Sequence, residues 1–516
     1  MAGLEGLEPY YDLVIVGAGL SGAVFAEQAA SRFGLTSLII DKRDHIGARP
    51  RGVWAQGPCA RREEQEERRD PVRGSGSTEF LCALRCPCAG GNCYDFIDKH
   101  GIRVSQYGVH LFHTQARRFY VSTPAQVPVA SRAHSAAAEP ARLGVRQQVE
   151  RVDAIRAPVR FPPRTPRLAT AACSPSVFRA ALPPSSGSSC SRHTQLCVSA
   201  LTLKPRSVKG RVDGKIVPIP PSQETVNTLF GANVHSEEEM EAWLAARRVV
   251  NPSPANGEEA ALSKAGEELY EKIFKHYTYK QWAKYPAELD ASVLLRIPVR
   301  TNTDDRYFTD PWQAIPSAGY TRIFENMLLG KAGITIRTGV DFFAVKEQLP
   351  RCGLLVYTGP IDAYYASLGM PKLEYRSLRF EEEYHEPQGG YYQEALQVNY
   401  PGCEVPYTRI VEYKHKPNQP PGVHELPGTV VFKEYSVDEG DPYYPVPTPL
   451  NQALFERYKD LAAKEPGVCF VGRLASYKYF NMDQAILNAL EIFDGLVQDG
   501  TLAPKQGFTA QPGAAA

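Results

Sequence analysis

Regular alternation of apolar and polar positions covers most of the chain but stops twice. Residues 12–46, 91–114 and 208–500 show strand-like or helix-like periodicity, with turn residues between the periodic segments. From 48 to 89 and from 115 to 207 neither period is sustained, and the second stretch is rich in Pro, Ala, Ser and Arg. We interpret both as insertions that are disordered, because they cannot bury enough apolar area to offset the entropy of ordering.

The periodic stretches contain several segments with a clear secondary-structure pattern. YDLVIVGAGLSGAVFAEQAA (11–30) is an apolar run that enters a glycine-rich turn and then a helical pattern, so it predicts a strand, a turn and a helix. Two further strands that end in glycine are predicted over 353–359 and 468–472. Two amphipathic helices are predicted over 261–277 and 482–497. The tail after about Thr501 is expected to fray.

Length and composition limit the function classes. A chain of 516 residues is long enough for two to four domains and a sizeable core, which excludes a small disulfide-stapled module. Lys and Arg number 58 against 57 Asp and Glu, so no overall field draws the protein to nucleic acid or anionic lipid. The mean hydropathy of −0.32 and the lack of an 18-residue apolar run argue against a membrane span. With no signal-peptide pattern at the start, we expect a cytoplasmic protein.

The cysteines do not indicate a disulfide framework or a metal site. Their number, 11, is odd, and most lie in the two aperiodic stretches, so we expect mainly reduced thiols. Cys82, Cys86, Cys88 and Cys93 are clustered, but their spacing differs from paired zinc knuckles and no His stands at ligand distance in sequence. For the basic, Pro-rich stretch we favour a solvated insert over a segment that binds nucleic acid or an SH3-like partner.

The strongest chemical motif is the glycine pattern that follows the first strand. Gly17 allows a tight turn, Gly19 allows a pyrophosphate to approach the backbone, and Gly22 allows close packing of helix on strand. The next strand ends at Asp41, where a carboxylate is expected to bind a ribose hydroxyl. We favour a dinucleotide site over a simple glycine-rich helix cap. FAD or NAD fits better than NADP, and a matching strand, glycine and helix over 469–486 favours FAD.

Two pairs of polar residues in apolar surroundings are further candidates. His110 and His113 are three apart in VSQYGVHLF and FHT, a segment that alternates like a strand, so they are expected to face opposite sides. Contact of one His with the flavin ring is therefore favoured over a metal site. Arg296 in VLLRIPV and Arg409 in VPYTRI are candidates for binding a diphosphate, although a structural salt bridge is the simpler interpretation of either one.

Taken together, these segments resemble the bacterial type of UDP-galactopyranose mutase. The resemblance extends over nearly all of the chain outside the two insertions. The strings that carry it are GAGLSGAVFAEQ, DKRDHIG, GNCYD, YGVHLFHT, YTYKQWAKYPAELDASVLLRIPVRTNTDDRYF, IPSAGYTRIFENML, YTGPIDAYY, YRSLRFE, VPYTRIVEYKH, KEYS, YYPV and VGRLASYKYFNMDQA.

This resemblance implies an α/β protein of three parts: a discontinuous Rossmann-like FAD-binding domain, a helical domain and an antiparallel β-sheet domain, with the active site between them. The predicted boundaries are 10–47, 90–114 and 446–500 for the FAD-binding domain, 208–300 for a mainly helical substrate domain, 301–445 for the antiparallel sheet mixed with returning segments of the FAD domain, and 501–516 for a flexible tail.

The resemblance also implies a reaction. The family interconverts UDP-galactopyranose and UDP-galactofuranose without net redox change, yet needs its FAD reduced. N5 of the reduced flavin attacks the anomeric carbon, UDP leaves, and the opened sugar, held as an iminium adduct, closes again through a different hydroxyl. Two converging guanidinium groups would stabilise the departing diphosphate.

Site residues follow from matching positions. Arg296 and Arg409 match the diphosphate-binding arginines. The catalytic set that we predict adds His110 and Asn481; Asn481 replaces an Asp of some members, so no carboxylate base is assigned there. The phosphate-contacting tyrosines of the family are matched by Tyr307, Tyr444 and Tyr479. Its uridine and substrate side is matched by Tyr277 and Trp282. Its flavin contacts are matched by Gly91, Asn92, Arg473 and Asp483.

Two departures from the family pattern leave alternatives open. About 43 residues separate Gly47 from Gly91, where the family runs on directly, and the stretch after FHT replaces an aromatic helical segment. We hypothesise that both are translated intervening sequence. The alternatives to a mutase are an amine-oxidase-like flavin oxidoreductase and an inactive cofactor-binding product of the interrupted chain. A homodimer is compatible with the sequence, which does not fix the oligomeric state.

Overall fold

The computed structural model describes residues 4–43, 93–115, 201–202 and 208–508. The cofactor positions predicted at Gly91 and Asn92 lie outside the described residues. So do the predicted insertions, apart from Gln115 and the short strand at 201–202.

A five-stranded parallel sheet carries the glycine motif. Its strand order is β10-β2-β1-β11-β17, and every neighbouring pair is parallel. The strands are β1 (Tyr10–Val16), β2 (Ser37–Asp41), β10 (Ile334–Thr338), β11 (Arg351–Tyr357) and β17 (Val468–Phe470). They come from three distant parts of the chain, as expected for a discontinuous Rossmann-like domain. The predicted strands that precede glycines at 359 and 472 are β11 and β17.

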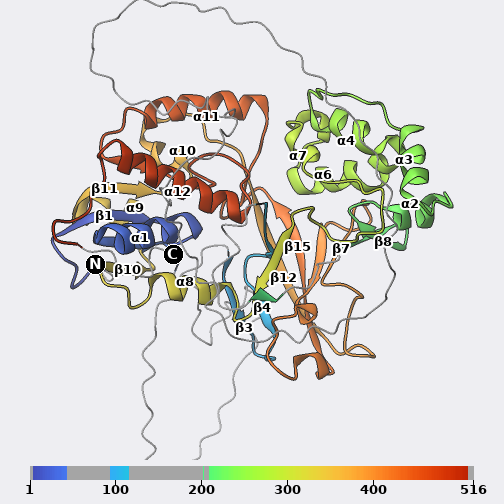
Figure 1. Cartoon of the computed structure of the whole chain (residues 1–516), viewed down its shortest axis with the longest axis horizontal. Helices are drawn as coiled ribbons and strands as arrows, with labels where there is room; N and C mark the ends of the chain where they lie inside the picture. The colour runs from blue at the N-terminus through green and yellow to red at the C-terminus, as the bar shows by residue number, and fades with distance from the viewer. Residues whose placement is uncertain (1–3, 44–92, 116–200, 203–207, 509–516) are drawn as a thin grey trace, which may run out of the picture. The chain divides into compact units, whose positions relative to one another are not determined.

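Apolar residues line both faces of this sheet. Leu13 and Ile15 of β1 belong to a core formed with α1 (Leu20–Phe33), α8 (Tyr320–Leu328) and α12 (Met482–Gln498). Val14 faces a second core that includes Phe342 of α9 (Phe342–Val345). Figure 1 shows α1 and α12 close together beside β1. Burial on both sides explains why these strands are continuous apolar runs.

The end of the chain differs from its prediction. Residues 501–508 were expected to be a flexible tail, but Leu502 is buried in the core formed with α1 and α12. Lys505 Nζ lies 2.8 Å from Asp12 Oδ2, and the ring of Phe508 packs beside Gly34. The flexible-tail prediction is therefore wrong for these residues, because two apolar side chains and one ion pair anchor them.

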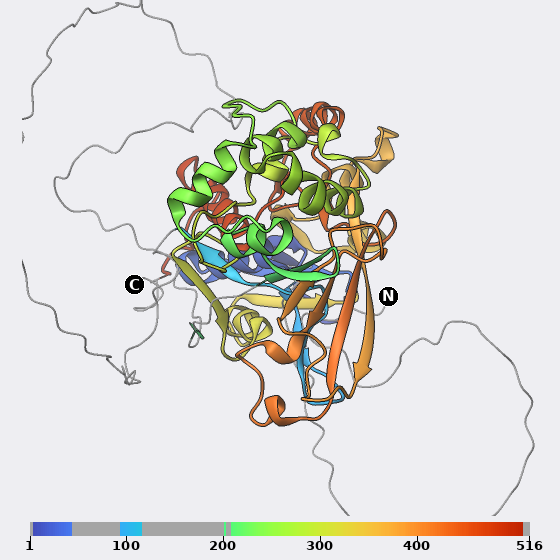
Figure 2. The same ribbon diagram turned by 90° about the vertical axis from the view of Figure 1, so that its right-hand side faces the viewer.

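A second sheet of seven strands holds the candidate arginine at position 409. Its order is β16-β12-β15-β14-β13-β7-β8, antiparallel except between β13 and β7. The strands are β7 (Val208–Val212), β8 (Lys215–Ile219), β12 (Tyr375–His385), β13 (Gln397–Asn399), β14 (Arg409–Glu412), β15 (Thr429–Val437) and β16 (Tyr444–Pro445). In Figure 2 the long orange strands β12 and β15 run side by side. Its first hairpin, β7 and β8, falls within the range that we expected to be mainly helical.

Helices follow that hairpin. They are α2 (Gln223–Phe230), α3 (Glu237–Ala245), α4 (Gly257–Ala265), α5 (Glu267–Leu269), a π-helical turn (Tyr270–Lys275), α6 (His276–Trp282) and α7 (Ser292–Leu295). A continuous helix over 261–277 was predicted, but it is broken at Gly266, whose φ is +78°. Helical spacing of the apolar residues survives the break, so the pattern alone does not reveal it.

Two small sheets are formed by short strands, and the second of them joins strands from before and after the helices in sequence. β3 (Asp95–Ile97) pairs with β4 (Arg103–Ser105), and β9 (Trp312–Pro316) lies between β5 (Phe112–Thr114) and β6 (Leu201–Thr202). The strand expected through His110 is not continuous: residues 106–111 form a turn and a loop. Gly108 there has φ +93°, which ends the extended conformation.

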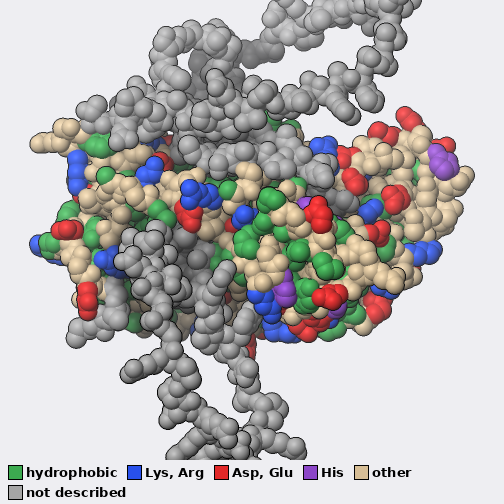
Figure 3. All heavy atoms as spheres, turned by 90° about the horizontal axis from the view of Figure 1, so that it is seen from below, with side chains coloured by type: hydrophobic (Ala, Val, Ile, Leu, Met, Phe, Trp, Pro, Cys, Tyr) green, Lys and Arg blue, Asp and Glu red, His purple; other side chains and the backbone are tan. Residues whose placement is uncertain are grey.

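Within the described residues, no helix is both long and apolar enough to span a membrane. On the face shown in Figure 3, basic and acidic side chains are interspersed. This agrees with the nearly balanced charge of the sequence.

Candidate active site

The glycine motif forms an open cradle at the start of α1. Gly17 has φ +105°, and a Cβ there would overlap Thr358 Oγ1; a Cβ on Gly22 would overlap the carbonyl oxygen of Gly17. Gly19, in contrast, has no heavy atom within 4 Å of its Cβ position. It caps α1 without a side-chain hydrogen bond, so within the described residues no side chain of the cap occupies the first N–H groups of the helix. Gly17 and Gly22 thus stand where only a glycine avoids a clash, and the space at Gly19 fits the pyrophosphate that the sequence predicts there.

Asp41 ties this cradle to the end of β2. Its Oδ2 accepts a hydrogen bond from Ala18 N at 2.8 Å, and its Oδ1 accepts one from Arg43 N at 2.9 Å. Each carboxylate oxygen keeps a second lone pair for a ribose hydroxyl. The side chain therefore fixes the glycine turn and keeps acceptors for the ribose hydroxyl that the sequence predicts there.

The C-terminal strand, glycine and helix meet the N-terminal motif. Gly472 has φ +95°, and a Cβ there would lie 2.6 Å from Ser21 Oγ of α1. Its N–H donates to Asn488 Oδ1 at 2.9 Å. Segments about 450 residues apart in sequence thus close around one cradle, and their small residues make the close approach possible. The residues present fit an FAD.

Arg473 and Asp483 lie next to that junction. Arg473 Nη2 donates to the Phe480 carbonyl, and its Cζ lies 5.4 Å from the centre of the Tyr479 ring. Asp483, in the first turn of α12, accepts a hydrogen bond from Gln484 N at 2.8 Å. Asn481 caps α12, and its N–H donates to Gln484 Oε1 at 2.9 Å.

Arg296 and Arg409 differ in how they are held. Arg296 Cζ lies 4.1 Å from the centre of the Tyr479 ring, and Nη2 lies 3.4 Å from Tyr479 Oη. Among the described residues no carboxylate pairs with Arg296. Arg409 Nε donates to Glu434 Oε2 at 2.6 Å, and the Glu434 side chain is fully buried. The salt-bridge interpretation is therefore correct for Arg409 but not for Arg296.

Glu434 keeps Arg409 charged without using its whole guanidinium. Burial disfavours the charge of Arg409, but the neighbouring carboxylate outweighs this, so the pKa of Arg409 is raised well above its ordinary value. Only Nε is engaged: neither Nη group hydrogen-bonds to a described residue. The N–H groups on both Nη atoms of the charged Arg409 therefore remain available to a ligand.

Aromatic side chains surround the two arginines. Trp282 is buried, and its ring centre lies 6.1 Å from that of Tyr444 and 5.8 Å from that of Tyr479. Burial, together with Tyr479, raises the pKa of Tyr444 to about 12. Burial also raises the pKa of Tyr277, against the opposing effect of Arg409, with a further increase from Tyr307. These effects place Tyr277 and Tyr444 near Arg409 and keep both hydroxyl groups protonated as hydrogen-bond donors.

A cavity of about 100 Å³ adjoins this cluster. Three of its lining residues, Arg296, Tyr307 and Asn481, were predicted as site residues. The others are His113, Ile297, Pro298, Phe308, Thr309 and Asp310. His110 does not line it; its ring centre lies 6.2 Å from that of Tyr320. The structure thus brings His113, rather than His110, to the cavity.

Sequence reasoning missed Glu434 and Asp310 as functional candidates. Glu434 stands in the string KEYS, two positions after Phe432, so it shares the face of β15 on which that apolar side chain is buried. This spacing is the signal that was available, because a carboxylate at an inward strand position needs a partner. Asp310 is in an irregular loop, where no period indicates direction.

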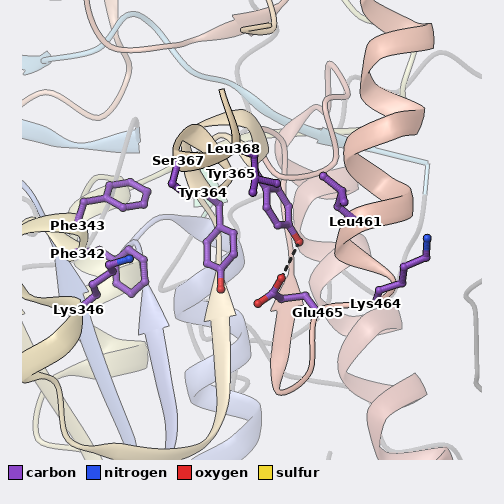
Figure 4. A pocket seen from close by; sticks show the side chains of 10 residues that line it. All are labelled: Phe342, Phe343, Lys346, Tyr364, Tyr365, Ser367, Leu368, Leu461, Lys464 and Glu465. Carbon is purple, nitrogen blue, oxygen red and sulfur yellow. Dashed lines mark hydrogen bonds between the residues drawn. The ribbon is translucent and has the colours of Figure 1, made fainter. Parts of the chain in front are cut away.

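A larger cavity of about 390 Å³ lies elsewhere and contains none of the predicted site residues. Figure 4 shows its lining: Phe342, Phe343, Lys346, Tyr364, Tyr365, Ser367, Leu368, Leu461, Lys464 and Glu465. Tyr365 Oη donates to Glu465 Oε2 at 3.4 Å across it.

The parallel sheet, the glycine cradle and the adjoining mixed sheet define a dinucleotide-binding enzyme of the Rossmann type. A model of the NAD(P)-binding Rossmann-like domain matches residues 15–54, and the UDP-galactopyranose mutase family model matches residues 272–479. A probable UDP-galactopyranose mutase of Klebsiella pneumoniae is 32% identical over 490 residues, which is 94% of either chain. The chain belongs to the UDP-galactopyranose mutase family, whose members are flavin-dependent isomerases acting on nucleotide sugars.

Two further similarities complete this comparison. A dTDP-fucopyranose mutase of Escherichia coli is 36% identical over 298 residues, or 55% of this chain and 75% of that protein. The crystal structure of a reduced UDP-galactopyranose mutase superposes with a TM-score of 0.56 and 14% identity, over 95% of this chain and 96% of that one. That superposition confirms the predicted fold class.

Proposed function

We propose that this enzyme interconverts UDP-galactopyranose and UDP-galactofuranose with its FAD in the reduced state. In this proposal N5 of the reduced flavin attacks the anomeric carbon as UDP leaves, and a flavin–sugar iminium intermediate precedes ring closure through another hydroxyl. Family membership and the cradle of Gly17, Gly19 and Gly22 support the cofactor.

The arrangement of the two arginines is the observation that carries the proposal. Within the described part of the chain, both Nη groups of Arg409 and the whole guanidinium of Arg296 have no carboxylate partner, although aromatic rings surround both residues. Arg296 lies against Tyr479 and Arg409 lies near Tyr444, and these two rings are 5.1 Å apart between their centres. A diphosphate has the charge and the oxygen spacing to accept hydrogen bonds from both cations. Their role is to stabilise the negative charge that develops on the departing UDP.

Neighbouring residues supply orientation. Tyr277 and Tyr444 donate hydrogen bonds from hydroxyls whose pKa values are raised. Tyr307 lines the small cavity, and the rings of Tyr479 and Trp282 pack against that of Tyr444. Asn481 at the cavity offers an uncharged amide to the sugar. We assign Asp41, Arg473 and Asp483, with His110, to the cofactor side.

The test uses the redox state of the flavin. Purified enzyme is incubated with UDP-galactofuranose with and without dithionite, and UDP-galactopyranose is measured by chromatography. Turnover is expected only after reduction. Equal turnover by the oxidised enzyme would contradict the proposal, and oxygen-dependent oxidation of an amine would indicate the oxidase alternative.

A second nucleotide sugar is an alternative candidate substrate. The similarity to a dTDP-fucopyranose mutase is higher in identity over its matched region, so a dTDP-linked 6-deoxy sugar is the alternative substrate. The ratio of kcat/KM for UDP-galactofuranose and dTDP-fucofuranose decides between them. The first is expected to exceed the second.

A further inference from the structure

His113 and Asp310 form a rigid imidazole–carboxylate pair at the small cavity. His113 Nδ1 lies 2.8 Å from Asp310 Oδ2, and the side chains are only 8% and 16% exposed. The imidazole stacks on Phe308, with ring centres 3.6 Å apart and planes 14° from parallel. Stacking and the hydrogen bond together leave the ring one orientation.

The backbone around the pair is fixed by the small sheet. His113 in β5 is the register partner of Gln313 in β9. Gln313 Nε2 donates to the carbonyls of Phe308 and Asp310 at 3.0 and 2.9 Å. Asp310 Oδ1 also accepts from Gln115 Nε2 at 2.8 Å. The carboxylate is therefore held in place from both sides, as in carboxylate–imidazole pairs that orient a catalytic base.

The free nitrogen of the ring borders the cavity. Among the described residues only Asp310 hydrogen-bonds to the His113 ring. A carboxylate acceptor at Nδ1 favours the proton on that nitrogen, so Nε2 is left to exchange a proton with a ligand. Of the other lining residues, Asn481 carries an amide, which neither takes up nor releases a proton. The imidazole of His113 is thus the lining group that can both accept and donate a proton at the nitrogen facing away from its carboxylate partner.

We propose that His113, oriented by Asp310, carries the proton that the sugar must move during ring opening and closure. This inference rests on the proposed function. Nε2 of the Nδ1–H tautomer carries no proton at the start, so it first accepts the proton that is released when the attacking nitrogen bonds to the anomeric carbon. As the bond between the anomeric carbon and the ring oxygen breaks, its electron pair stays on that oxygen, which takes this proton from Nε2. When the C4 oxygen bonds to the anomeric carbon, its hydroxyl proton passes to Nε2, which returns it to the same nitrogen as the sugar is released. The imidazole ends as it began, so the balance needs no further reactant.

The experiment separates cleavage of the anomeric bond from the change of ring size. UDP-galactopyranose labelled with 18O between sugar and β-phosphate is given to the reduced enzyme. Movement of the label to a non-bridging position reports cleavage and return of UDP, and furanose formation reports isomerisation. For His113→Gln we expect isomerisation to fall at least about 100-fold, with label exchange within about threefold of the wild type. Asp310→Asn should show the same split, with a loss of about tenfold.

His100 provides the matched control. Its ring stacks on Tyr384 at 4.0 Å, away from the residues of the cavity. His100→Gln should leave both rates unchanged. Parallel loss of exchange and isomerisation in His113→Gln, or normal isomerisation, would overturn the inference. If His113→Gln does not retain flavin, a missing split in Asp310→Asn overturns it instead.

A second readout does not depend on turnover. In protein with 15N-labelled histidine, the His113 signal should show the Nδ1–H tautomer in the wild type and lose it in Asp310→Asn. The opposite tautomer in the wild type would contradict the orientation argued here. If the reduced wild-type enzyme shows neither label exchange nor isomerisation, the proposed function fails, and that result differs from every outcome of the variants.

Discussion

Glu434 stands directly opposite Arg409 in the pairing of β14 with β15, and its carboxylate is fully buried. One oxygen accepts from Arg409 Nε, whereas Oε1 has no hydrogen-bond partner within the described part of the chain. A buried carboxylate in this position is stable only while the guanidinium remains beside it. The pair therefore links the stability of the sheet to the charge of the site.

The two arginines should respond differently to the same substitution. Arg296→Ala is expected to lower turnover at least about 100-fold, or roughly 3 kcal/mol of lost charge stabilisation, with FAD content and unfolding free energy unchanged. Arg409→Ala should lose as much turnover and also unfold more easily, because it leaves Glu434 unpaired. Arg379→Ala, at a half-exposed side chain on β12, is the control. Unchanged turnover would make the arginines structural.

Removing the carboxylate should cost stability. Glu434→Ala is expected to lower the free energy of unfolding by about 3 to 5 kcal/mol, because it leaves a buried guanidinium without its counter-charge. Glu347→Ala, which removes an 87% exposed partner of Lys346, should change it by less than about 0.5 kcal/mol. Denaturant titration measures both, and equal small losses would show that the buried pair contributes little.

Filling the cradle should remove the cofactor. Gly19→Val places a branched side chain in the only open glycine position of the motif, so the purified protein should lack the flavin absorption spectrum. Gly495→Val adds the same side chain on the exposed part of α12, where nothing lies within 4 Å either. That control should keep its flavin. Normal flavin content in Gly19→Val would refute the site.

Strain next to Trp282 can be released. Ala283 ends α6 with φ +53°, a left-handed conformation that costs a residue with a Cβ about 1 kcal/mol relative to Gly. Ala283→Gly releases this strain but adds about 0.4 to 1 kcal/mol of entropy to the unfolded chain, so the free energy of unfolding is expected to rise by about 0.5 kcal/mol at most. A lower denaturant midpoint would show that the φ value is not a source of strain.

Lys280 should make stability depend on alkaline pH. Its ammonium donates to the carbonyls of Tyr400, Val405 and Tyr407, and burial lowers its pKa to about 8, from an ordinary 10.5. Between these values the unfolded chain binds the proton more tightly, so the free energy of unfolding gains up to about 2 kcal/mol from pH 8 to 9.5. Below pH 8 the cost of burial is constant. Lys280→Met should lack this gain in paired denaturant titrations; equal slopes would contradict it.

The sequence predicted the parallel-sheet domain better than the site around it. Strands such as β1 and β11 are continuous apolar runs beside glycines, so local pattern and tertiary structure agree. The break in the helix at Gly266 was not predicted, because the helical spacing of apolar residues continues on both sides of it. The strand expected through His110 ends for a related reason: alternation gives direction only while a strand continues, and the loop around Gly108 interrupts it. Pairing of Arg409 with Glu434 depends on strand register, which periodicity does not specify.

The pairing of β2 with β10 has a consequence for how much extra chain the fold tolerates. About 290 residues separate these neighbouring strands, and both aperiodic stretches fall between them. The free energy of closing a flexible loop grows only with the logarithm of its length, so nearly doubling this connection costs about 0.6 kcal/mol. Strand alignment in the nucleotide-binding sheet is thus thermodynamically almost indifferent to long additions at this point, although a longer search should slow its assembly.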